Sequence, residues 1–245
     1  MARLLAVRRY AMKRVLAATV VALTFLVAVE AAVSARPIGP PPILGGSQPA
    51  SPWAEPLSEE SLGVLSTCST GYRYAEYQWP TIPASSSSAG VKWNTTTLYS
   101  GGHVGGWVGV SNNAATRWIQ AGLERTYGDS SISKYIEYKT DAGYSFVNKG
   151  TASAGTVYTA VVTKVAAGSW TASIGGSGLG FNISLSDMQK TDFAGESYQG
   201  INGNCNVMDI NFSNSSTGTG SMTKIQNSPY VVDSITSNGW RSHGG

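Results

Sequence analysis

The sequence is poor in the residues from which metal sites and nucleophilic active sites are usually built. It has two histidines, His103 and His243, and two cysteines among 245 residues. A zinc-type metal site takes about four ligands at clustered spacings, and the sequence has no such cluster, so we expect no metal and no cofactor. A serine nucleophile needs a base, which is usually histidine, and no G-x-S-x-G elbow is present. Serine-hydrolase chemistry is therefore not expected.

Charge is sparse and nearly balanced once the N-terminus is set aside. Charged residues make up 13% of the chain, with 17 basic and 14 acidic residues in total. The first 35 residues hold five basic residues and one acidic residue, so the remaining 210 have 12 basic and 13 acidic residues and a net charge of −1. No basic run is left to follow a phosphate backbone, so nucleic acid is not an expected partner.

The N-terminus has the pattern of an export signal. Basic residues precede an apolar run of 15 residues over 15–29, and Val33-Ser34-Ala35 has the small residues of a signal-peptidase site. The run is shorter than the roughly 20 residues of a membrane-spanning helix, although a retained anchor is the alternative. We expect residues 1–35 to be removed and the rest to be secreted, extracellular and free of the membrane. The Ala- and Arg-rich signal indicates a bacterial source.

Residues 36–63 form a proline-rich segment, with seven prolines between positions 37 and 56. Each proline fixes φ and removes a backbone donor, so the segment should not join a sheet or a helix. We expect an extended linker, with a short pro-segment as the alternative.

Residues 64–245 are expected to form one all-β domain, a concanavalin A-like antiparallel β-sandwich or jelly roll, present as a monomer. β-branched and aromatic residues suit a pleated surface, and Gly/Ser/Asn clusters provide turns. No window after the signal has helical periodicity. About ten short strands separated by turns are typical of a sandwich. The expected strands are 91–99, 106–110, 118–124, 134–139, 143–147, 157–165, 169–174, 193–198, 207–212 and 230–235.

Cys68 and Cys205 are expected to form a disulfide, because two cysteines in an oxidising compartment usually pair. The alternative is two separate buried thiols. The chain-entropy model assigns a loop of this length a stabilisation of roughly 4 to 5 kcal/mol as an upper figure.

Glutamates in or beside the expected strands are candidates for acid–base chemistry. In segment 118–124 the apolar residues share one face and Gln120 lies on the other; in segment 134–139, Glu137 lies opposite Ile136. An acid among aromatic side chains on a sheet face is placed for a raised pKa, although a solvated outward position is the common alternative. The candidates are Glu76, Glu124, Glu137 and Glu196.

Four short motifs occur in order between about residues 85 and 213. They are Trp107-Val108-Gly109-Val110, Ile119-Gln120-Ala121-Gly122, Tyr135-Ile136-Glu137-Tyr138 and Ala194-Gly195-Glu196-Ser197-Tyr198. Their order and spacing resemble the eqolisins, the glutamic peptidases, which are secreted β-sandwich endopeptidases active in acid. The sequence is most similar to the bacterial relatives of that family.

The resemblance implies a catalytic dyad of Gln120 and Glu196 on one concave sheet. A carboxylate can act as general base on the attacking water, and a neutral amide N–H can stabilise the oxyanion. Such a site needs neither metal nor nucleophile. The residues expected to bind substrate or support the dyad are Trp107, Trp118, Glu137 and Tyr198.

The sequence departs from the family pattern at two places. The peptidases usually carry an aspartate in a Gly-Ile-Asp-Gly run, where this chain has Gly109-Val110-Ser111-Asn112. The chain reads Gly195-Glu196-Ser197-Tyr198 where a peptidase has Ala-Glu-Trp. Loss of a supporting carboxylate commonly lowers activity by orders of magnitude, so the resemblance implies the fold more firmly than the activity.

Two functions from different classes follow. The first is a secreted endopeptidase that hydrolyses a polypeptide substrate at acid pH through Glu196 and Gln120. The second is a noncatalytic module that binds an extracellular glycan or cell-wall polymer. In the second, aromatic residues would stack on sugar rings, unless they belong to the core. These aromatic residues are Trp93, Trp107, Trp118 and Tyr198.

Overall fold

The computed structural model describes residues 67–82, 85–217 and 221–245. The expected export signal (1–35) and the proline-rich segment (36–63) lie outside the described residues, so both stay predictions. Every regular element in the described ranges is a β-strand. Within the same ranges, no helix has the length and apolar character needed to cross a membrane.

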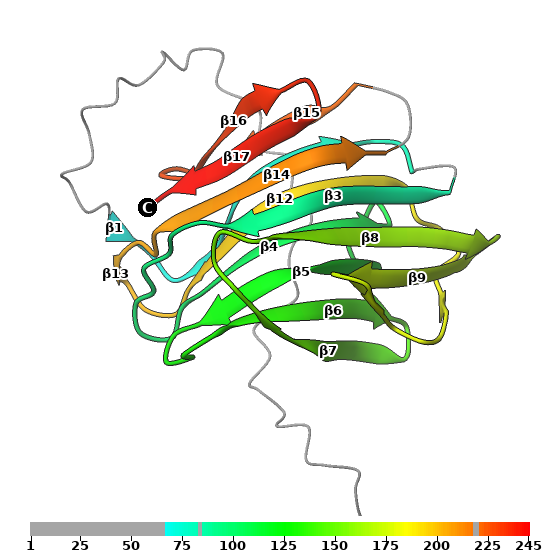
Figure 1. The fold of residues 1–245 in the computed structure, drawn as a ribbon, viewed down its shortest axis with the longest axis horizontal. Helices are drawn as coiled ribbons and strands as arrows, with labels where there is room; N and C mark the ends of the chain where they lie inside the picture. The colour runs from blue at the N-terminus through cyan, green and yellow to red at the C-terminus, as the bar shows by residue number, and fades with distance from the viewer. Residues whose placement is uncertain (1–66, 83–84, 218–220) are drawn as a thin grey trace, which may run out of the picture. The chain divides into compact units, whose positions relative to one another are not determined.

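Two antiparallel sheets pack face to face in a sandwich, which confirms the predicted all-β fold (Figure 1). The seven-stranded sheet has the order β15-β2-β12-β4-β5-β6-β7. Its strands are β2 (Gly71–Trp79), β4 (His103–Ser111), β5 (Trp118–Thr126), β6 (Ile132–Thr140), β7 (Gly143–Ala152), β12 (Lys190–Gln199) and β15 (Thr223–Gln226).

The eight-stranded sheet has the order β10-β9-β8-β3-β14-β17-β16, with β11 paired to β9. Its strands are β3 (Ser86–Trp93), β8 (Val157–Ala166), β9 (Ser169–Ile174), β10 (Ser177–Gly178), β11 (Ile183–Ser184), β14 (Met208–Ser216), β16 (Val231–Thr236) and β17 (Gly239–Gly244). A separate short pair joins β1 (Thr67–Cys68) to β13 (Gly203–Asn204).

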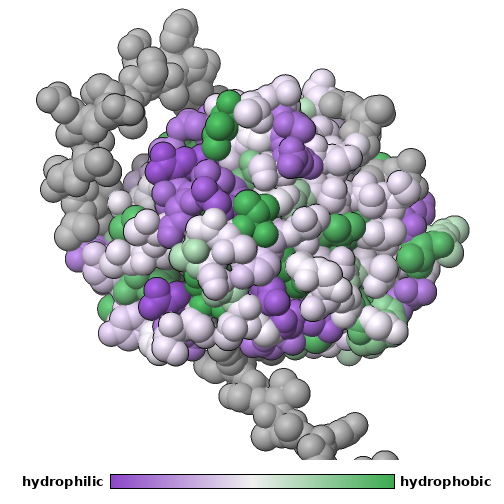
Figure 2. Space-filling view, viewed as in Figure 1, coloured by the Kyte–Doolittle hydropathy of each residue, from purple (hydrophilic) through white to green (hydrophobic). Residues whose placement is uncertain are grey.

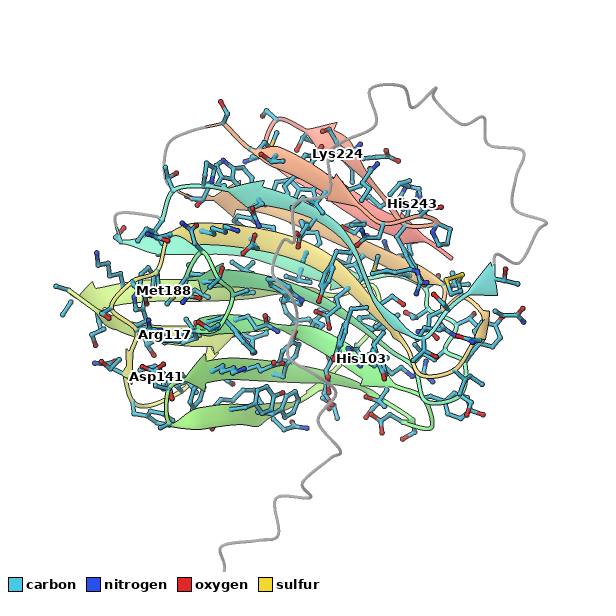
Figure 3. The ribbon with its side chains drawn as sticks, turned by 180° about the vertical axis from the view of Figure 1, so that it is seen from behind. His103, Arg117, Asp141, Met188, Lys224 and His243 are labelled. Carbon is cyan, nitrogen blue, oxygen red and sulfur yellow. A yellow bond between two sulfur atoms is a disulfide. The ribbon has the colours of Figure 1, made fainter. Side chains whose placement is uncertain are left out.

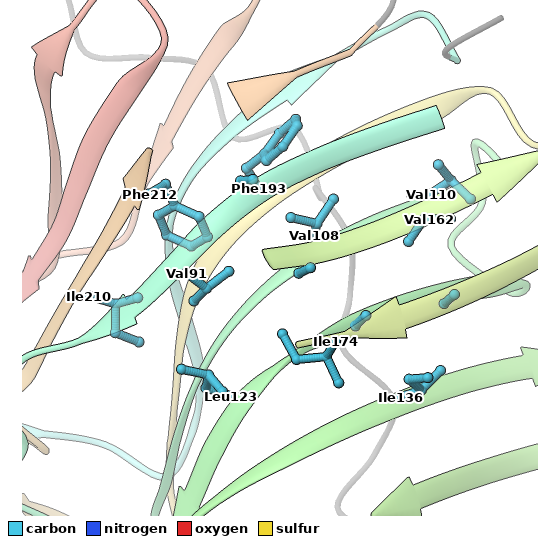
Figure 4. Packing of buried hydrophobic residues seen from close by; sticks show 14 of the residues in the cluster. Val91, Val108, Val110, Leu123, Ile136, Val162, Ile174, Phe193, Ile210 and Phe212 are labelled. Atoms are coloured by element: carbon cyan, nitrogen blue, oxygen red, sulfur yellow. The ribbon is translucent and has the colours of Figure 1, made fainter. Parts of the chain in front are cut away.

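The main core lies between the two sheets, because alternate side chains of each strand point inward. Val108 and Phe193 come from the seven-stranded sheet, and Val91 and Phe212 come from the eight-stranded sheet (Figure 4). Burying a side chain of this size contributes about 1.5–3 kcal/mol relative to leaving it in water. The other face of the eight-stranded sheet is pale with scattered coloured patches in Figure 2, as on an ordinary solvated surface.

The predicted disulfide between Cys68 and Cys205 is confirmed. The two Cα atoms are 4.9 Å apart and the residues are separated by 137 positions in the sequence. The bridge ties β1 to the residue that follows β13. Asn206, next to it, is fully buried and donates to the Tyr198 carbonyl at 2.8 Å, so the polar groups beside the disulfide are satisfied locally.

The strand predictions missed β2, β15, β17 and the two-residue strands β1, β10, β11 and β13, and they placed one strand too far along the chain. Segment 94–99 was expected to extend a strand, but β3 ends at Trp93. The Asn94 side chain donates to Asp209 at 3.0 Å, and beyond it only an isolated bridge at Thr97 continues the pairing.

Candidate active site

The face of the seven-stranded sheet that points away from the core carries a dense set of polar and aromatic side chains. As predicted, Gln120 lies on this face while Ile119 lies in the main core. Figure 3 views the molecule from this side. We call it the polar face; its central members are Tyr72, Tyr74, Glu76, His103, Trp107, Trp118, Gln120, Glu124, Tyr135, Glu137, Asp192, Glu196 and Tyr198.

Glu196 of β12 is held by two side chains of the neighbouring strand β4. Its Oε1 lies 2.9 Å from Nε2 of His103, and its Oε2 accepts a hydrogen bond from Nε1 of Trp107 at 3.3 Å. The register explains this arrangement, because Glu196 lies directly opposite Gly105. The side chains at 103 and 107 flank that glycine, which leaves room between them. Both carboxylate oxygens are therefore held in place, as a positioned acid–base group requires.

Gln120 of β5 is held by two side chains of β6. Its amide nitrogen donates to the Tyr135 hydroxyl and to Oε2 of Glu137, both at 3.3 Å. Its oxygen is buried and has no hydrogen-bond partner among the described residues. The oxygen and nitrogen of an amide are distinguished only by their hydrogen bonds. The opposite orientation would give the carbonyl to Tyr135 and Glu137 and direct the N–H groups toward the unpartnered position.

The charge state of Glu137 decides which orientation is favoured. The pKa of Glu137 is raised to about 8, first by burial and then by the charges of Glu196 and Glu124. Below this pH the carboxyl group carries a proton and can donate it, as the Tyr135 hydroxyl can. Both groups can then donate to the Gln120 carbonyl, which frees the amide N–H groups to bind a developing oxyanion.

Gln120 and Glu196 share one face but are not neighbours. Gln120 lies opposite Gly109 and Glu196 opposite Gly105, four residues apart along β4. In the described part of the chain, no hydrogen bond joins the two. The indole of Trp107 lies between them: its nitrogen bonds Glu196, and its six-membered ring comes within 3.0 Å of where a Cβ on Gly109 would stand. Gln120 and Glu196 therefore both approach the indole of Trp107 and not each other.

The polar face is buried rather than open at this point. Gln120 is 2% exposed and Glu196 is 6% exposed. Trp107 and Trp118 are fully buried on the same face. A ligand can therefore reach the two polar groups only if the atoms that cover them move.

Each supporting residue expected from the sequence has a defined contact. Tyr198 stacks on His103 with ring centroids 5.5 Å apart. The ring of Trp118 lies 5.2 Å below the ammonium group of Lys139, a cation–π contact. Tyr198 thus belongs to the Glu196 side of the face, and Trp118 to the Gln120 side.

Sequence reasoning missed His103 as a member of this site, since the strand expected there began only at residue 106. The structure places it at the first position of β4 (labelled in Figure 3). The signal that could have found it is the period of two that puts residues 103 and 107 on the same face of a strand.

Sequence reasoning named Glu76 as a candidate but missed Asp192, with which it forms a buried acidic pair on the polar face. Glu76 and Asp192 lie on adjacent strands, and both are fully buried. Burial raises the pKa of Asp192 to about 7, although a 2.8 Å hydrogen bond from Gln78 lowers it in part. Burial and then the charge of Asp192 raise the pKa of Glu76, whose two oxygens have no hydrogen-bond partner among the described residues.

Ser111, where the eqolisin-like pattern has an aspartate, is also buried, and its hydroxyl lacks a hydrogen-bond partner within the described ranges. The carboxyl group in this part of the face comes instead from β12, where Asp192 lies opposite Gly109. Within the described residues, no three histidine, cysteine or acidic side chains come together as metal ligands.

Comparisons with known proteins bear on the fold. No protein-family model matches the sequence, and no curated protein does. The chain is similar to a solved structure of scytalido-glutamic peptidase with a transition state analog inhibitor, at 15% identity and a TM-score of 0.52, over 74% of this chain and 100% of that chain. It is also similar to SCP-B, a member of the eqolisin family of peptidases in a complex with the tripeptide Ala-Ile-His, at 16% identity and a TM-score of 0.47, with the same coverage.

A carbohydrate-binding module, CBM66 from Bacillus subtilis, is a more distant match, at 9% identity and a TM-score of 0.35 over 62% of this chain and 84% of that chain. At such low identities the likeness concerns the fold alone.

Proposed function

We propose that this protein is a secreted peptide hydrolase of the glutamic type, with Glu196 as general acid–base and Gln120 as oxyanion donor. The observation that carries the proposal is the two-point fixation of the Glu196 carboxylate by His103 and Trp107, on the same sheet face as an amide fixed by its own pair of partners. Export is supported by the Cys68–Cys205 disulfide, which is typical of an oxidising compartment.

The reaction needs one water and no other reagent. Glu196 takes a proton from the water, whose oxygen attacks the scissile carbonyl carbon. The carbonyl oxygen gains negative charge, which an N–H of Gln120 stabilises. The carboxyl of Glu196 then gives the proton to the leaving nitrogen, and the carbon–nitrogen bond breaks to yield an acid and an amine.

Because Gln120 and Glu196 are separated along β4, the substrate has to bridge them. An extended peptide laid across the strands can do so if its scissile carbonyl enters above Gly105, a position on β4 that lacks a side chain and lies directly opposite Glu196. Because both polar groups are buried, the atoms that cover them must move when the peptide binds.

The test is hydrolysis of a denatured protein substrate at pH 3 to 5 by the mature chain. We expect Glu196→Gln to lower the rate by at least about 1,000-fold, as for loss of an essential acid–base group, and Gln120→Ala by about 100-fold, as for loss of an oxyanion donor. Asp141→Asn, at a surface carboxyl that pairs only with Arg117, is the matched control and should have no effect. Unchanged hydrolysis in Glu196→Gln would refute the assignment.

The glycan-binding alternative named four aromatic residues as stacking platforms, and three of these are buried. Trp93 lies in the main core, and Trp107 and Trp118 are fully buried. Tyr198 alone of the four is partly exposed. Retention of the wild-type chain on insoluble cell-wall polysaccharide, together with an absence of proteolysis, would favour the alternative over the peptidase.

A further inference from the structure

His103 is fixed beside Glu196 by more than a single hydrogen bond. Its ring stacks on Tyr198 at 5.5 Å and meets the edge of Tyr72 at 5.7 Å. These two rings come from β12 and β2, so three adjacent strands hold the imidazole. Its side chain keeps 23% of its surface exposed, so protons from solvent can reach it.

The charges around His103 favour its protonated form. Burial lowers the pKa of His103, but the hydrogen bond to Glu196, the charge of Glu196 and the charge of Glu124 outweigh burial and raise it overall. The groups that face the ring are Glu196 and Tyr198 on β12, Tyr72 on β2, and Glu124 and Thr126 on β5. A raised pKa means that the imidazolium–carboxylate pair is complete at acid pH and is lost as the pH rises through the pKa of His103.

We propose that His103 is a positioning residue for Glu196, and that loss of its proton sets the upper pH limit of the site. The inference rests on the proposed peptidase function, which uses His103 as a fixed partner of Glu196 and assigns nothing to its protonation. Protonated His103 donates Nε2–H to Oε1 of Glu196, while Trp107 donates to Oε2. The two donors together fix the carboxylate. Neutral His103 provides at best an uncharged donor, and the carboxylate loses its counter-charge.

The first test is independent of catalysis. The imidazole carbons of the two histidines are followed by NMR against pH in the wild type and in Glu196→Gln, with signals assigned from His103→Gln and His243→Gln. We expect the pKa of His103 to fall by about one pH unit or more in Glu196→Gln, because its charged partner is gone and burial now dominates. His243 lies in the other sheet, 2.7 Å from Asp233, so its signals come from a site apart from Glu196.

Equal titration of His103 in the wild type and in Glu196→Gln would overturn the inference. Asp233→Asn, which removes a carboxylate from the other sheet, is the matched control and should leave the titration of His103 unchanged. Figure 3 labels the two histidines, which belong to different sheets.

The second test is the pH profile of kcat/KM for peptide hydrolysis. In the wild type, we expect the rate to fall as the pH rises through the value at which NMR shows His103 to lose its proton. In His103→Gln, which keeps a neutral donor, we expect that fall to disappear while the rate at pH 4 drops by about 10-fold. His103→Phe keeps the stacking but no donor and should be slower than His103→Gln.

Superimposable profiles for the wild type and His103→Gln would overturn the role of His103 in setting the pH limit. If the wild type hydrolyses no peptide at any pH, the peptidase proposal fails, whereas the NMR titration still decides whether His103 and Glu196 act as a pair. Thermal unfolding of each variant confirms that the compared chains are folded.

Discussion

Gln120 of β5 and Glu137 of β6 are direct register partners, and the Gln120 amide nitrogen lies 3.3 Å from Oε2 of Glu137. A carboxyl group on the adjacent strand therefore sets the orientation of the proposed oxyanion donor. Because burial raises the pKa of Glu137 to about 8, this carboxyl is a neutral donor throughout the acid range. Gln120 is therefore supported by a protonated carboxyl group rather than by a charged one.

Substitution of Glu137 should separate its orienting role from its charge. In Glu137→Gln, the new amide can still donate to the Gln120 carbonyl, so we expect hydrolysis at pH 4 to stay within about threefold of wild type. In Glu137→Ala, Gln120 loses that donor, and we expect a fall of about 10- to 100-fold in kcat with little change in KM. The measurement is steady-state hydrolysis of a fluorogenic peptide. Equal rates for the two variants would contradict the orienting role.

Trp107→Phe should weaken the proposed site while keeping much of its packing. The variant removes the Nε1 donor to Glu196 and retains an aromatic ring over β4. A hydrogen bond to a charged group is worth about 1.5–3 kcal/mol, so we expect kcat/KM to fall by about 10- to 100-fold. The measurement is kcat/KM at pH 4, corrected for the folded fraction by near-UV circular dichroism.

Trp170→Phe is the matched control for Trp107→Phe. Trp170 is equally buried, but its Nε1 donates to the Leu185 carbonyl in the region of the other sheet. We expect it to lose stability and to keep full activity per folded molecule. A similar loss of activity in both variants would mean that Trp107 acts only through packing.

The acidic pair should make the fold less stable as the pH rises. Burial raises the pKa of Asp192 to about 7, whereas an unfolded chain titrates near 3.9. Between those values the folded protein keeps a proton that the unfolded chain has released, so the free energy of unfolding falls as the pH rises through about 4 to 7. Asp192→Asn removes this titration and leaves an oxygen that can accept from Gln78.

We therefore expect Asp192→Asn to be more stable than the wild type at pH 8, by roughly 1–4 kcal/mol, and about equal to it at pH 4. Urea unfolding at the two pH values measures the difference. Asp141→Asn is the control, because that side chain is 83% exposed and should change stability by less than about 0.5 kcal/mol at either pH. A wild-type stability that rises from pH 4 to pH 8 would contradict the prediction.

The sequence was informative where apolar and polar residues alternate cleanly. Ile119 and Ala121 identify the core side of β5, so the face of Gln120 could be predicted. Strand β2 could not be predicted in this way, because both of its faces are aromatic and polar: Tyr77 points into the main core while Tyr74 lies on the polar face. Periodicity distinguishes faces only when their chemistry differs.

The contact between His103 and Glu196 could not be predicted from such patterns. The two residues are 93 positions apart, and they meet only because β4 and β12 pair with Gly105 opposite Glu196. A shift of one residue in that register would turn Glu196 toward the other face of the sheet. Register between distant strands is set by the packing of the whole sandwich, so a single sequence does not reveal it.

Substitution by alanine should lower the stability of the fold at one glycine of the polar face and leave it nearly unchanged at another. A Cβ on Gly122 would overlap the Gly106 carbonyl oxygen and stand 2.7 Å from Cβ of Trp107, so β4 or the indole must move. We expect Gly122→Ala to cost about 1–3 kcal/mol of stability, as overpacking does. A Cβ on Gly105 would meet nothing closer than 3.7 Å, which is ordinary contact.

Gly105→Ala should therefore fold with nearly wild-type stability, although its methyl group lies directly opposite Glu196. Urea unfolding separates the two variants, and hydrolysis at pH 4 then tests the space above β4. If a scissile carbonyl enters above Gly105, the added methyl group should raise KM by about 10-fold or more while the protein stays folded, because an intruding methyl group displaces the substrate. An unchanged KM in a folded Gly105→Ala chain would mean that the substrate binds over another part of the polar face and not over this glycine.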